Sequence, residues 1–515
     1  MAKQKRRKAR QGSVLIYELI GKMSSDEKRY FKIYAQKYEK GDSNLCLSLF
    51  NAINAELHKG AEVTDEAIRA RIKGHNLESY FVSAKNKLKN MLCDALYEMH
   101  SKHTDEFAIM KGIGIAGILN DRGFAKDADK QLKQAMDMAK QKEYFTLWLE
   151  GFRHKVNYSV TNVSASFPLL HTWRDEMEEV VMLLDNYSHE VLNNRLTFNA
   201  YLAAPDKIDK RTVSVFNENC LTANVKNARS AYAKYLALNA LLFYYEKTKR
   251  RKEVRPIALQ QKNILYETLN HTVRYAGEFF VAYQNYLNSL DPVKHAELII
   301  KESHEMEKLA QQLLPKVRNK RMVLLAVNNA TMIRLNVFIE HNNIFGLKEE
   351  LPHAVKLIAQ TKGELGIAIQ VVLSALIKDG YFITGNYTEA LKWIRQIKSA
   401  APPGILNHYK LCNLLTELMI LIDTNASVKA LRNSEENLRL AITRFNYTVE
   451  QQKALQALLK LLSAVPTARN VKELEQNLNR ITDFAANIKK GTDGTLKNVV
   501  AESNAVRWAQ RKMKH

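Results

Sequence analysis

The apolar residues of this chain recur at the three- and four-residue spacing of amphipathic α-helices along almost its whole length. The clearest case is the stretch 366–403, where two periodic segments meet at a turn around Gly385 and the pattern ends at two prolines. A pair of helices joined by a short turn is therefore predicted here. The apolar positions that define the two helices are Ile369, Val372, Leu373, Leu376 and Ile377, then Ala390, Leu391, Ile394 and Ile397.

Capping residues and glycines divide the first hundred residues into four predicted helices. Ser24 and Glu27 have the spacing of a capping box, and Thr64 is placed to cap a short third helix that ends at Gly74. The fourth helix, over residues 77–99, is apolar along its whole inner face. These helices are expected to form a module that covers one end of a helical repeat.

Further along the chain, the periodicity predicts long helices separated by short polar connections. Two stretches are expected to be continuous helices, 219–252 and 264–289. Gly accounts for only 19 and Pro for only 9 of the 515 residues, which is typical of a helical chain with few strand-breaking positions. The sequence therefore predicts an all-α protein. The remaining helices are expected at 293–314, 322–339, 347–361, 406–423, 426–444, 448–462 and 471–488.

Two short motifs carry a resemblance to a known family. The run Gly385-Asn386-Tyr387-Thr388-Glu389-Ala390-Leu391 resembles the turn and second helix of a tetratricopeptide repeat. The run from Gly123 to Ala128, with Leu132 and Ala135 beyond it, resembles a second such turn. The resemblance implies an α-solenoid of stacked antiparallel helix pairs that binds other macromolecules, with Ala128 and Ala390 buried where helices cross.

This resemblance and the charge pattern together suggest four regions. Residues 1–12 are expected to be a basic disordered arm and residues 13–104 an N-terminal helical cap module. Residues 105–490 are expected to form the tetratricopeptide-like α-solenoid, and residues 491–515 a basic C-terminal tail.

Two other motifs have alternative interpretations. Residues 112–117 match GxGxxG, the dinucleotide fingerprint, but the stretch after them is helix-periodic and supplies no second strand. Close helix packing is therefore the favoured explanation of these glycines. The third and fourth predicted helices could also form a DNA-binding helix-turn-helix, although the fourth is longer and more apolar than a recognition helix. The side chains that would then face DNA are Lys85, Asn86, Lys87 and Lys89.

The chain is strongly basic, with 77 Lys and Arg against 54 Asp and Glu and a net charge of +23. Pooled cations suit phosphate contacts, so a polyanion such as RNA is a candidate partner. Tyr244 and Tyr245 lie next to the internal group of cations at 247–255, and these aromatic rings could stack on bases. The alternative is that these cations end a helix and complement its dipole. The two groups are Lys3, Lys5, Arg6, Arg7, Lys8 and Arg10, and Lys247, Lys249, Arg250, Arg251, Lys252 and Arg255.

The resemblance implies a groove for a protein or peptide partner on the first helix of each pair. The positions of the 366–403 repeat lack the Lys and Asn clamp that some family members use for a terminal carboxylate. An apolar or mixed helical partner is therefore expected. The groove positions are expected to be Val372, Ala375, Asp379, Phe382 and Ile383.

The sequence shows no recognisable catalytic or metal motif. It lacks HExxH, P-loop and GxSxG patterns, and its one Glu-x-x-His, from Glu350 to His353, is interrupted by Pro352. Four widely spaced cysteines favour a reducing, cytoplasmic setting, and no membrane span is expected. We therefore expect a non-enzymatic interaction scaffold without cofactors, in an oligomeric state that the sequence leaves open; the alternative is an RNA- or ribosome-associated repeat protein.

Overall fold

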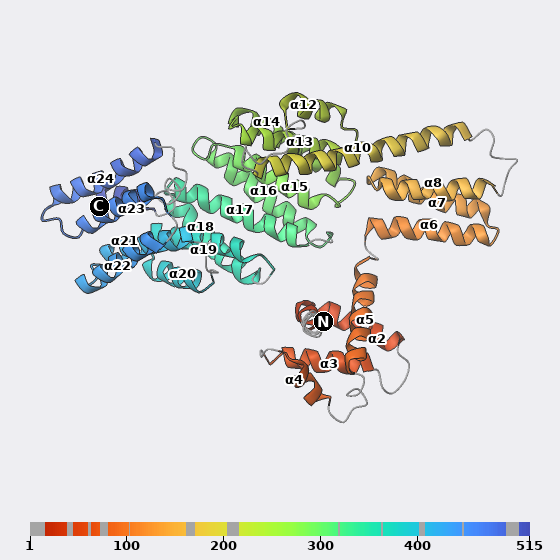
Figure 1. Cartoon of the computed structure of the whole chain (residues 1–515), viewed down its shortest axis with the longest axis horizontal. Helices are drawn as coiled ribbons and strands as arrows, with labels where there is room; N and C mark the ends of the chain where they lie inside the picture. Colours follow the sequence, from red (N-terminus) through yellow and green to blue (C-terminus); the bar gives the residue numbers. More distant parts are fainter. Residues whose placement is uncertain are drawn as a thin grey trace. The chain divides into compact units, whose positions relative to one another are not determined.

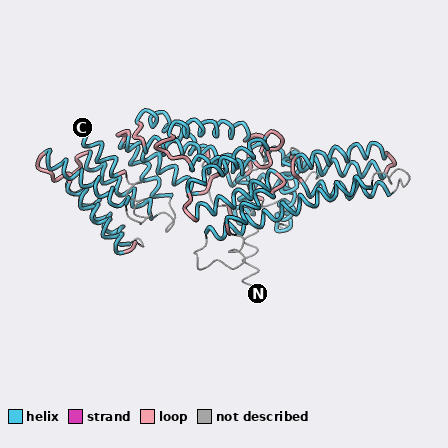
Figure 2. Tube along the Cα trace, turned by 90° about the horizontal axis from the view of Figure 1, so that it is seen from above, coloured by secondary structure: helices cyan, strands magenta, loops and turns pink. Residues whose placement is uncertain are grey.

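The computed structural model describes residues 16–38, 45–59, 63–72, 81–101, 104–160, 170–202, 216–317, 320–361, 364–400, 407–444, 447–490 and 504–514. Across these ranges the chain is helical, with turns between the helices and no strand (Figures 1 and 2). The predicted all-α class is confirmed. The basic arm, residues 1–12, lies outside the described ranges.

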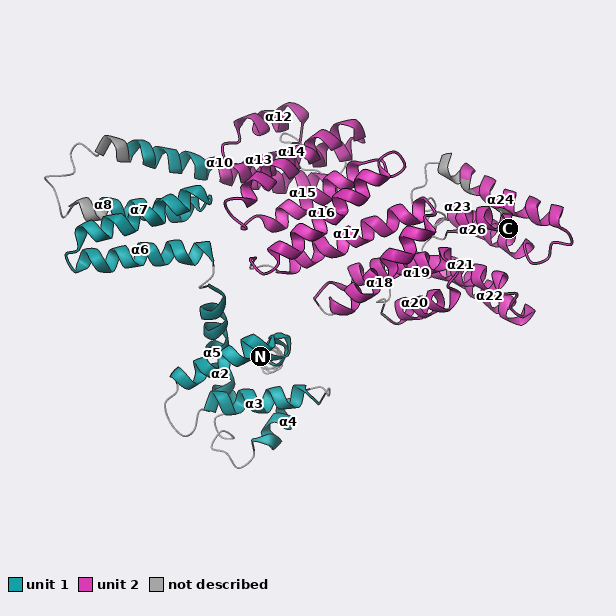
Figure 3. Cartoon of the chain, turned by 180° about the vertical axis from the view of Figure 1, so that it is seen from behind, with its two compact units in different colours: residues 1–185 teal, residues 186–515 magenta. Residues whose placement is uncertain are grey.

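The chain divides into two compact units, Met1–Asp185 and Asn186–His515, and the division falls within the 33-residue helix α10 (Figure 3). The helices that begin in the first unit are α2 (Ser25–Tyr38), α3 (Leu45–Leu57), α4 (Asp65–Arg71), α5 (Phe81–Ser101), α6 (Asp105–Asp121), α7 (Ala125–Gln141), α8 (Phe145–Val160) and α10 (Leu170–Leu202).

In the first unit, α2 to α5 enclose a core that includes the packed rings of Phe31 and Phe50, whose centroids are 4.6 Å apart. The capping box at Ser24 is confirmed: its amide donates to the Glu27 carboxylate at 2.7 Å. Lys85 on α5 is buried, and its Nζ donates to Asp65 at 2.8 Å. A lysine held in this way cannot face DNA, so the structure supports helix packing over the helix-turn-helix alternative.

The GxGxxG glycines of the first unit lie on α6, and the first of them, Gly112, serves helix packing. A Cβ added to Gly112 would stand 2.9 Å from the Cβ of Ala135 on α7, closer than real Cβ atoms approach. Glycine at this position therefore lets the two helices come together. No strand precedes or follows these residues in the described part of this region, so the dinucleotide fold is absent there.

In the second unit, consecutive helices pack against each other along the chain. Alternate helices also meet, α15 with α17, α17 with α19 and α19 with α21. The helices are α12 (Glu218–Asn227), α13 (Ala231–Lys247), α14 (Arg251–Leu269), α15 (Ala276–Ser289), α16 (Ala296–Leu313), α17 (Lys320–Glu340), α18 (Ile344–Gln360), α19 (Ile367–Ile383), α20 (Tyr387–Ala400), α21 (Asn407–Asp423), α22 (Val428–Arg444), α23 (Val449–Ala464), α24 (Val471–Lys490) and α26 (Ala505–Lys514).

Two predictions about element boundaries are wrong. The expected helix over 219–252 breaks before Ser230, whose hydroxyl accepts from the amide of Ala233 and starts α13. The expected helix over 264–289 breaks between α14 and α15. In the expected C-terminal tail, Ala505–Lys514 form helix α26, which packs on α24 and α21. Apolar periodicity continues across each break, so it does not reveal the caps.

Among the described residues, one type of turn recurs at the ends of six helices. A single residue adopts positive φ, and the next amide donates to the carbonyl five residues back, as from Phe124 to Leu119 and from Asn386 to Tyr381. Glycine supplies the positive φ only at Gly123 and Gly385, the two turns that the sequence motifs identify. The other four are Glu143, Lys249, Asn342 and Asn425.

Helix α17 has the length and mean hydropathy of a membrane-crossing segment, whereas the sequence pattern predicted none. Of its apolar window, 67% is buried inside the protein, as in the core helix of a folded unit. It also carries the buried polar residues Asn328 and Arg334, both hydrogen-bonded within the protein. These contacts account for α17 as a core helix.

Ala128 and Ala390, the small residues of the two turn motifs, are both fully buried as predicted. Replacing Ala390 by Leu adds three carbons to a filled core, so we expect the free energy of unfolding to fall by about 1–3 kcal/mol. Gln396→Leu on the exposed side of the same helix is the control and should change it by less than about 0.5 kcal/mol. Urea denaturation of both variants tests this; equal effects would contradict the close crossing at Ala390.

Candidate functional site

The internal cationic cluster lies at the turn between α13 and α14, and half of it belongs to the start of α14. Arg251, Lys252 and Arg255 fall within the first five residues of that helix. The alternative from the sequence, that these cations complement a helix C-terminus, is therefore wrong for them. A helix N-terminus carries a positive partial charge, so cations there are locally unfavourable. Their placement calls for another explanation, and binding of an anion supplies one.

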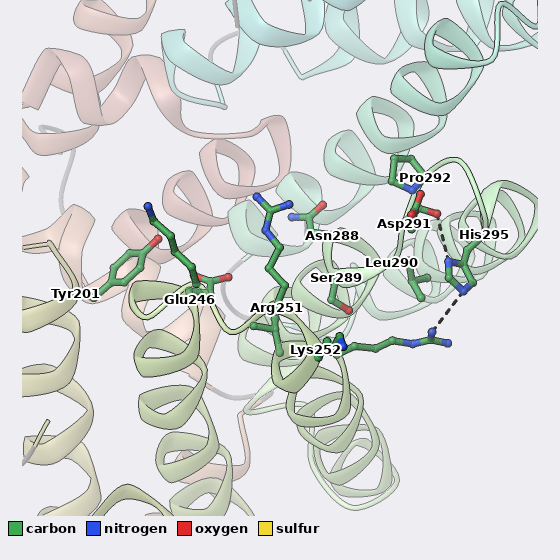
Figure 4. A pocket seen from close by; sticks show the side chains of 13 residues that line it. Tyr201, Glu246, Arg251, Lys252, Asn288, Ser289, Leu290, Asp291, Pro292 and His295 are labelled. Atoms are coloured by element: carbon green, nitrogen blue, oxygen red, sulfur yellow. Dashed lines mark hydrogen bonds between the residues drawn. The ribbon is translucent and has the colours of Figure 1, made fainter. Parts of the chain in front are cut away.

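These cations line a pocket of about 1280 Å³ in the second unit (Figure 4). Its wall comes from the end of α10, the α13–α14 turn and the α15–α16 connection. Two carboxylates, Glu246 and Asp291, are outnumbered by the cations. The lining residues are Tyr201, Glu246, Lys249, Arg251, Lys252, Val254, Arg255, Asn288, Ser289, Leu290, Asp291, Pro292 and His295.

Two members of the predicted cluster are structural. Arg250 donates to Glu218 and Glu253 and lies 4.8 Å from the ring centroid of Tyr245, which ties α12 to α14. Hydrogen bonds from Arg250, and then from Tyr245, hold the pKa of Glu218 below its usual value. Lys247 donates to the carbonyl oxygen of Tyr201 at 2.8 Å. Neither cation is therefore available to a ligand.

The other four cations are exposed. Arg255 lies 3.4 Å from His295 Nε2. Within the described ranges, Lys249, Arg251 and Lys252 have no carboxylate at ion-pair distance. These side chains can therefore turn toward a ligand without first breaking an ion pair.

Two helix N-termini add to the positive potential of this pocket. The cap residues of α14 and α16 are Arg250 and His295, and neither cap side chain hydrogen-bonds its helix. The Asp291 carboxylate accepts from the amides of Val293 and Lys294, which lowers its pKa. The first-turn amides of α14 have no such carboxylate among the described contacts. Uncapped helix N-termini beside Lys and Arg are a favourable environment for phosphate.

The aromatic residues proposed from the sequence do not face this pocket. Tyr245 is buried and its hydroxyl donates a hydrogen bond to Glu218 at 3.0 Å. The ring of Tyr244 packs on that of Phe216. The aromatic residue that lines the pocket is Tyr201, which is partly exposed and stacks on Phe243 with ring centroids 5.4 Å apart. No local pattern pointed to Tyr201, because it lies 46 residues before Lys247 in the chain.

The predicted peptide groove on α19 is not an open surface. Phe382 is 1% and Ile383 3% exposed, and Ala375 and Asp379 are also buried. The prediction that a partner docks on these four side chains is therefore wrong. Only Val372 stays partly exposed. Helix α26 contacts this face: Asn504 donates to Asp379 at 2.7 Å, and Arg511 donates to the carbonyls of Phe382 and Ile383.

A second pocket, of about 430 Å³, contains buried charges from α16, α17 and α18. Arg334, 1% exposed, donates to Glu307 and to Glu350, the latter at 2.7 Å. His353 Nε2 lies 2.9 Å from Glu307 Oε1. Pro352 does not break α18, so Glu350 and His353 both contribute to the cluster. Glu350 accepts from Arg334, whereas His353 contacts Glu307. No three His, Cys, Asp or Glu side chains are arranged to hold a metal within the described ranges.

The ionisable groups of this second pocket influence each other. Burial alone would raise the pKa of Glu307, but His353 and Arg334 hold it below its usual value. The contact with Glu307 raises the pKa of His353, whereas burial and Arg334 lower that of His304. Arg334 thus holds together two buried carboxylates from neighbouring helices, and the cluster is accounted for as a structural one.

No family model matches this chain, and no curated protein or solved structure does either. All four cysteines are free thiols, two of them buried. Function is therefore argued from the geometry of the two pockets and of the α26 contact. Of these, the basic pocket has exposed charged groups without a partner of opposite charge among the described residues, so it is the candidate site.

Replacing Arg334 by Leu should strongly destabilise the second unit, because Glu350 would remain as a buried carboxylate without Arg334 and Glu307 would keep only His353 as a charged partner. Breaking a buried ion pair in this way costs about 3–5 kcal/mol of unfolding free energy. The triple change Arg334→Leu, Glu307→Met and Glu350→Leu should restore most of it, since no charge is then left unpaired. Thermal and urea denaturation distinguish the two; no rescue by the triple variant would contradict the charge argument.

His353 should contribute pH-dependent stability. Its folded-state pKa is raised, so its contribution is complete below the unfolded value of about 6.5 and is lost as the pH rises through the folded pKa. The difference in thermal midpoint between the wild type and His353→Gln should be larger near about pH 5.5 than near about pH 8. His304, with the opposite shift, is present in both proteins, so its effect largely cancels. A difference that grows with pH would contradict the Glu307 contact.

Proposed function

We propose that this chain is a non-enzymatic helical-repeat protein that binds RNA, with the basic pocket at the α13–α14 turn as its phosphate-contacting site. The observation that carries the proposal is the placement of Arg251, Lys252 and Arg255 at a helix N-terminus, where they oppose the helix dipole. A bound phosphate would offset this unfavourable arrangement, because it interacts favourably with both the side chains and the helix end.

The form of the pocket supports a nucleic acid over a small anion. Its volume of about 1280 Å³ exceeds that of one phosphate group, and its cations are distributed along the α13–α14 turn and the start of α14. Tyr201 adds an aromatic side chain to the same wall. Cations for the backbone together with an aromatic side chain for a base are the usual composition of a single-stranded nucleic-acid site.

The bases of a single-stranded RNA can stack on Tyr201, and an acidic protein segment has no such group. An acidic peptide would use the cations but would gain little from Tyr201. Binding that depends on both Tyr201 and the cations therefore favours RNA, whereas binding that depends on the cations alone would favour an acidic peptide. The basic arm at residues 1–12 is a second proposed contact for the RNA backbone.

We further propose that the second unit is a tetratricopeptide-like solenoid. Supporting this, alternate helices α15, α17, α19 and α21 meet in sequence, as the first helices of stacked pairs would. The turns within three of these pairs share one geometry: one residue, Asn342, Gly385 or Asn425, adopts positive φ, and the next amide donates to the carbonyl five residues back. A repeated turn of one geometry is what a repeat architecture requires.

The RNA proposal is tested by filter binding of a labelled single-stranded RNA across a salt series. Changing Lys249, Arg251, Lys252 and Arg255 to Gln should weaken binding and flatten its salt dependence by about 0.7 log unit per lost contact for each tenfold rise in salt. Arg250 is left unchanged because it holds α12 and α14 together. Tyr201→Ala should weaken binding while leaving the salt slope nearly unchanged.

The charge-matched control removes four exposed cations elsewhere in the second unit, Lys429, Arg432, Arg439 and Lys453, again by Gln. It has the same net charge as the pocket variant, so a general electrostatic effect would alter both proteins equally. Equal salt slopes for the two variants, or RNA binding independent of salt, would remove this pocket as the RNA site.

A further inference from the structure

Helix α26 packs on α24 and α21, and three of its side chains donate hydrogen bonds to a single carboxylate, that of Asp423. Asp423, the last residue of α21, accepts from four donors, at distances of 2.6 to 3.3 Å. One donor, Tyr387, belongs to the α19–α20 pair. The other three, Trp508 Nε1, Arg511 Nη2 and Lys512 Nζ, come from α26.

Asp423 is unfavourably placed for the stability of its own helix. A carboxylate at a helix C-terminus faces the negative end of the dipole. The last carbonyls of α19, those of Phe382 and Ile383, add two more acceptors, and both bind Arg511. Asp379 adds another carboxylate, which accepts from Asn504. The face formed by α19 and α21 therefore presents acceptors and negative charge to any segment that covers it.

The side chains of α26 match this face. Its cations Arg507, Arg511 and Lys512 are partly exposed, whereas Trp508 is buried. Arg511 also lies over the rings of Phe382 and Tyr387, with distances of 5.3 and 6.0 Å to their centroids. Trp508 donates one hydrogen bond and covers apolar surface. The chemistry that this face recognises is an amphipathic helix with a tryptophan and a following Arg-Lys pair.

Part of the contact between α26 and the rest of the second unit is polar. Of the buried apolar residues on α26, only Trp508 is large; the other two are Ala505 and Ala509. Val506 and Met513 are partly buried against the same core, and the other contacts include charge-assisted hydrogen bonds, for which water and salt compete. A ten-residue helix is not stable alone in water, so α26 unfolds when it leaves the face. Small elements held by few apolar contacts open more often than the core around them.

We propose that the face formed by α19 and α21 is a binding site for a basic amphipathic helix, and that α26 is its resident, releasable ligand. A second helix carrying the pattern of Trp508, Arg511 and Lys512 competes with α26 for Asp423 and for the carbonyls at the end of α19. The proposal rests on α19, α21 and α26 and is independent of the basic pocket.

The first test is amide hydrogen exchange on the full-length chain. The amides of α26 should exchange at least about tenfold faster than those of α19 and α21, and a rise in salt from about 0.1 M to about 1 M should accelerate α26 alone. Arg480→Gln, an exposed change on α24, is the control and should leave the pattern unaltered. Exchange of α26 at the same rate as α21 would show that it is a fixed part of the core and would overturn the proposal.

The second test asks whether the face binds a helix in trans. A fluorescent peptide of residues 501–515 is added to the full-length chain carrying Trp508→Ala and Arg511→Gln, which weaken the resident helix. It should bind this variant at least about tenfold tighter than the wild type. Adding Asp423→Asn to the double variant should abolish the gain, as should the same two changes made in the peptide. The RNA-pocket variant should bind the peptide as the wild type does; equal peptide binding by wild type and double variant would overturn the proposal.

Discussion

The left-handed turn at the end of a helix is the constraint on which most of this structure depends. By placing one residue at positive φ, the chain reverses within three residues while the carbonyls of the last helical turn keep hydrogen-bond donors. The next helix then starts beside the previous one, and small residues such as Ala390 can bring the two into contact. Because this turn is defined by backbone geometry, glycine favours it but is not required. Lys249 and Glu143 adopt it with larger side chains.

The same turn determines what the basic cluster can do. With Lys249 at positive φ, the chain stops α13 at Lys247 and starts α14 at Arg251, so a run of cations is divided between two helix ends. Arg250 falls in the turn and is used to bind Glu218. Arg251 and Lys252 fall at an N-terminus, where the dipole makes their charge unfavourable unless an anion is present. Cations that are adjacent in the sequence therefore have different roles.

Two charge clusters of the second unit have different consequences. Arg334 lies among three helices and its Nη2 donates to two carboxylates that are themselves buried, so these partners cannot be exchanged without a large energetic cost. Asp423 lies at a helix end, and three of its four donors come from one short helix. The first arrangement is a fixed part of the core. The second has the chemistry of a binding site that is already occupied.

Local sequence patterns predict most of the helices, the caps at Ser24 and Thr64 and the two glycine turns, because these depend on residues within a few positions of each other. It could not place the break before Ser230, since the apolar pattern continues across it. It also failed for Phe382, which has the spacing of a groove residue but is covered by Arg511, 129 residues further along the chain. Contacts between distant segments have no local pattern, so only the tertiary structure decided that the groove is filled and that the cations of α14 line a pocket.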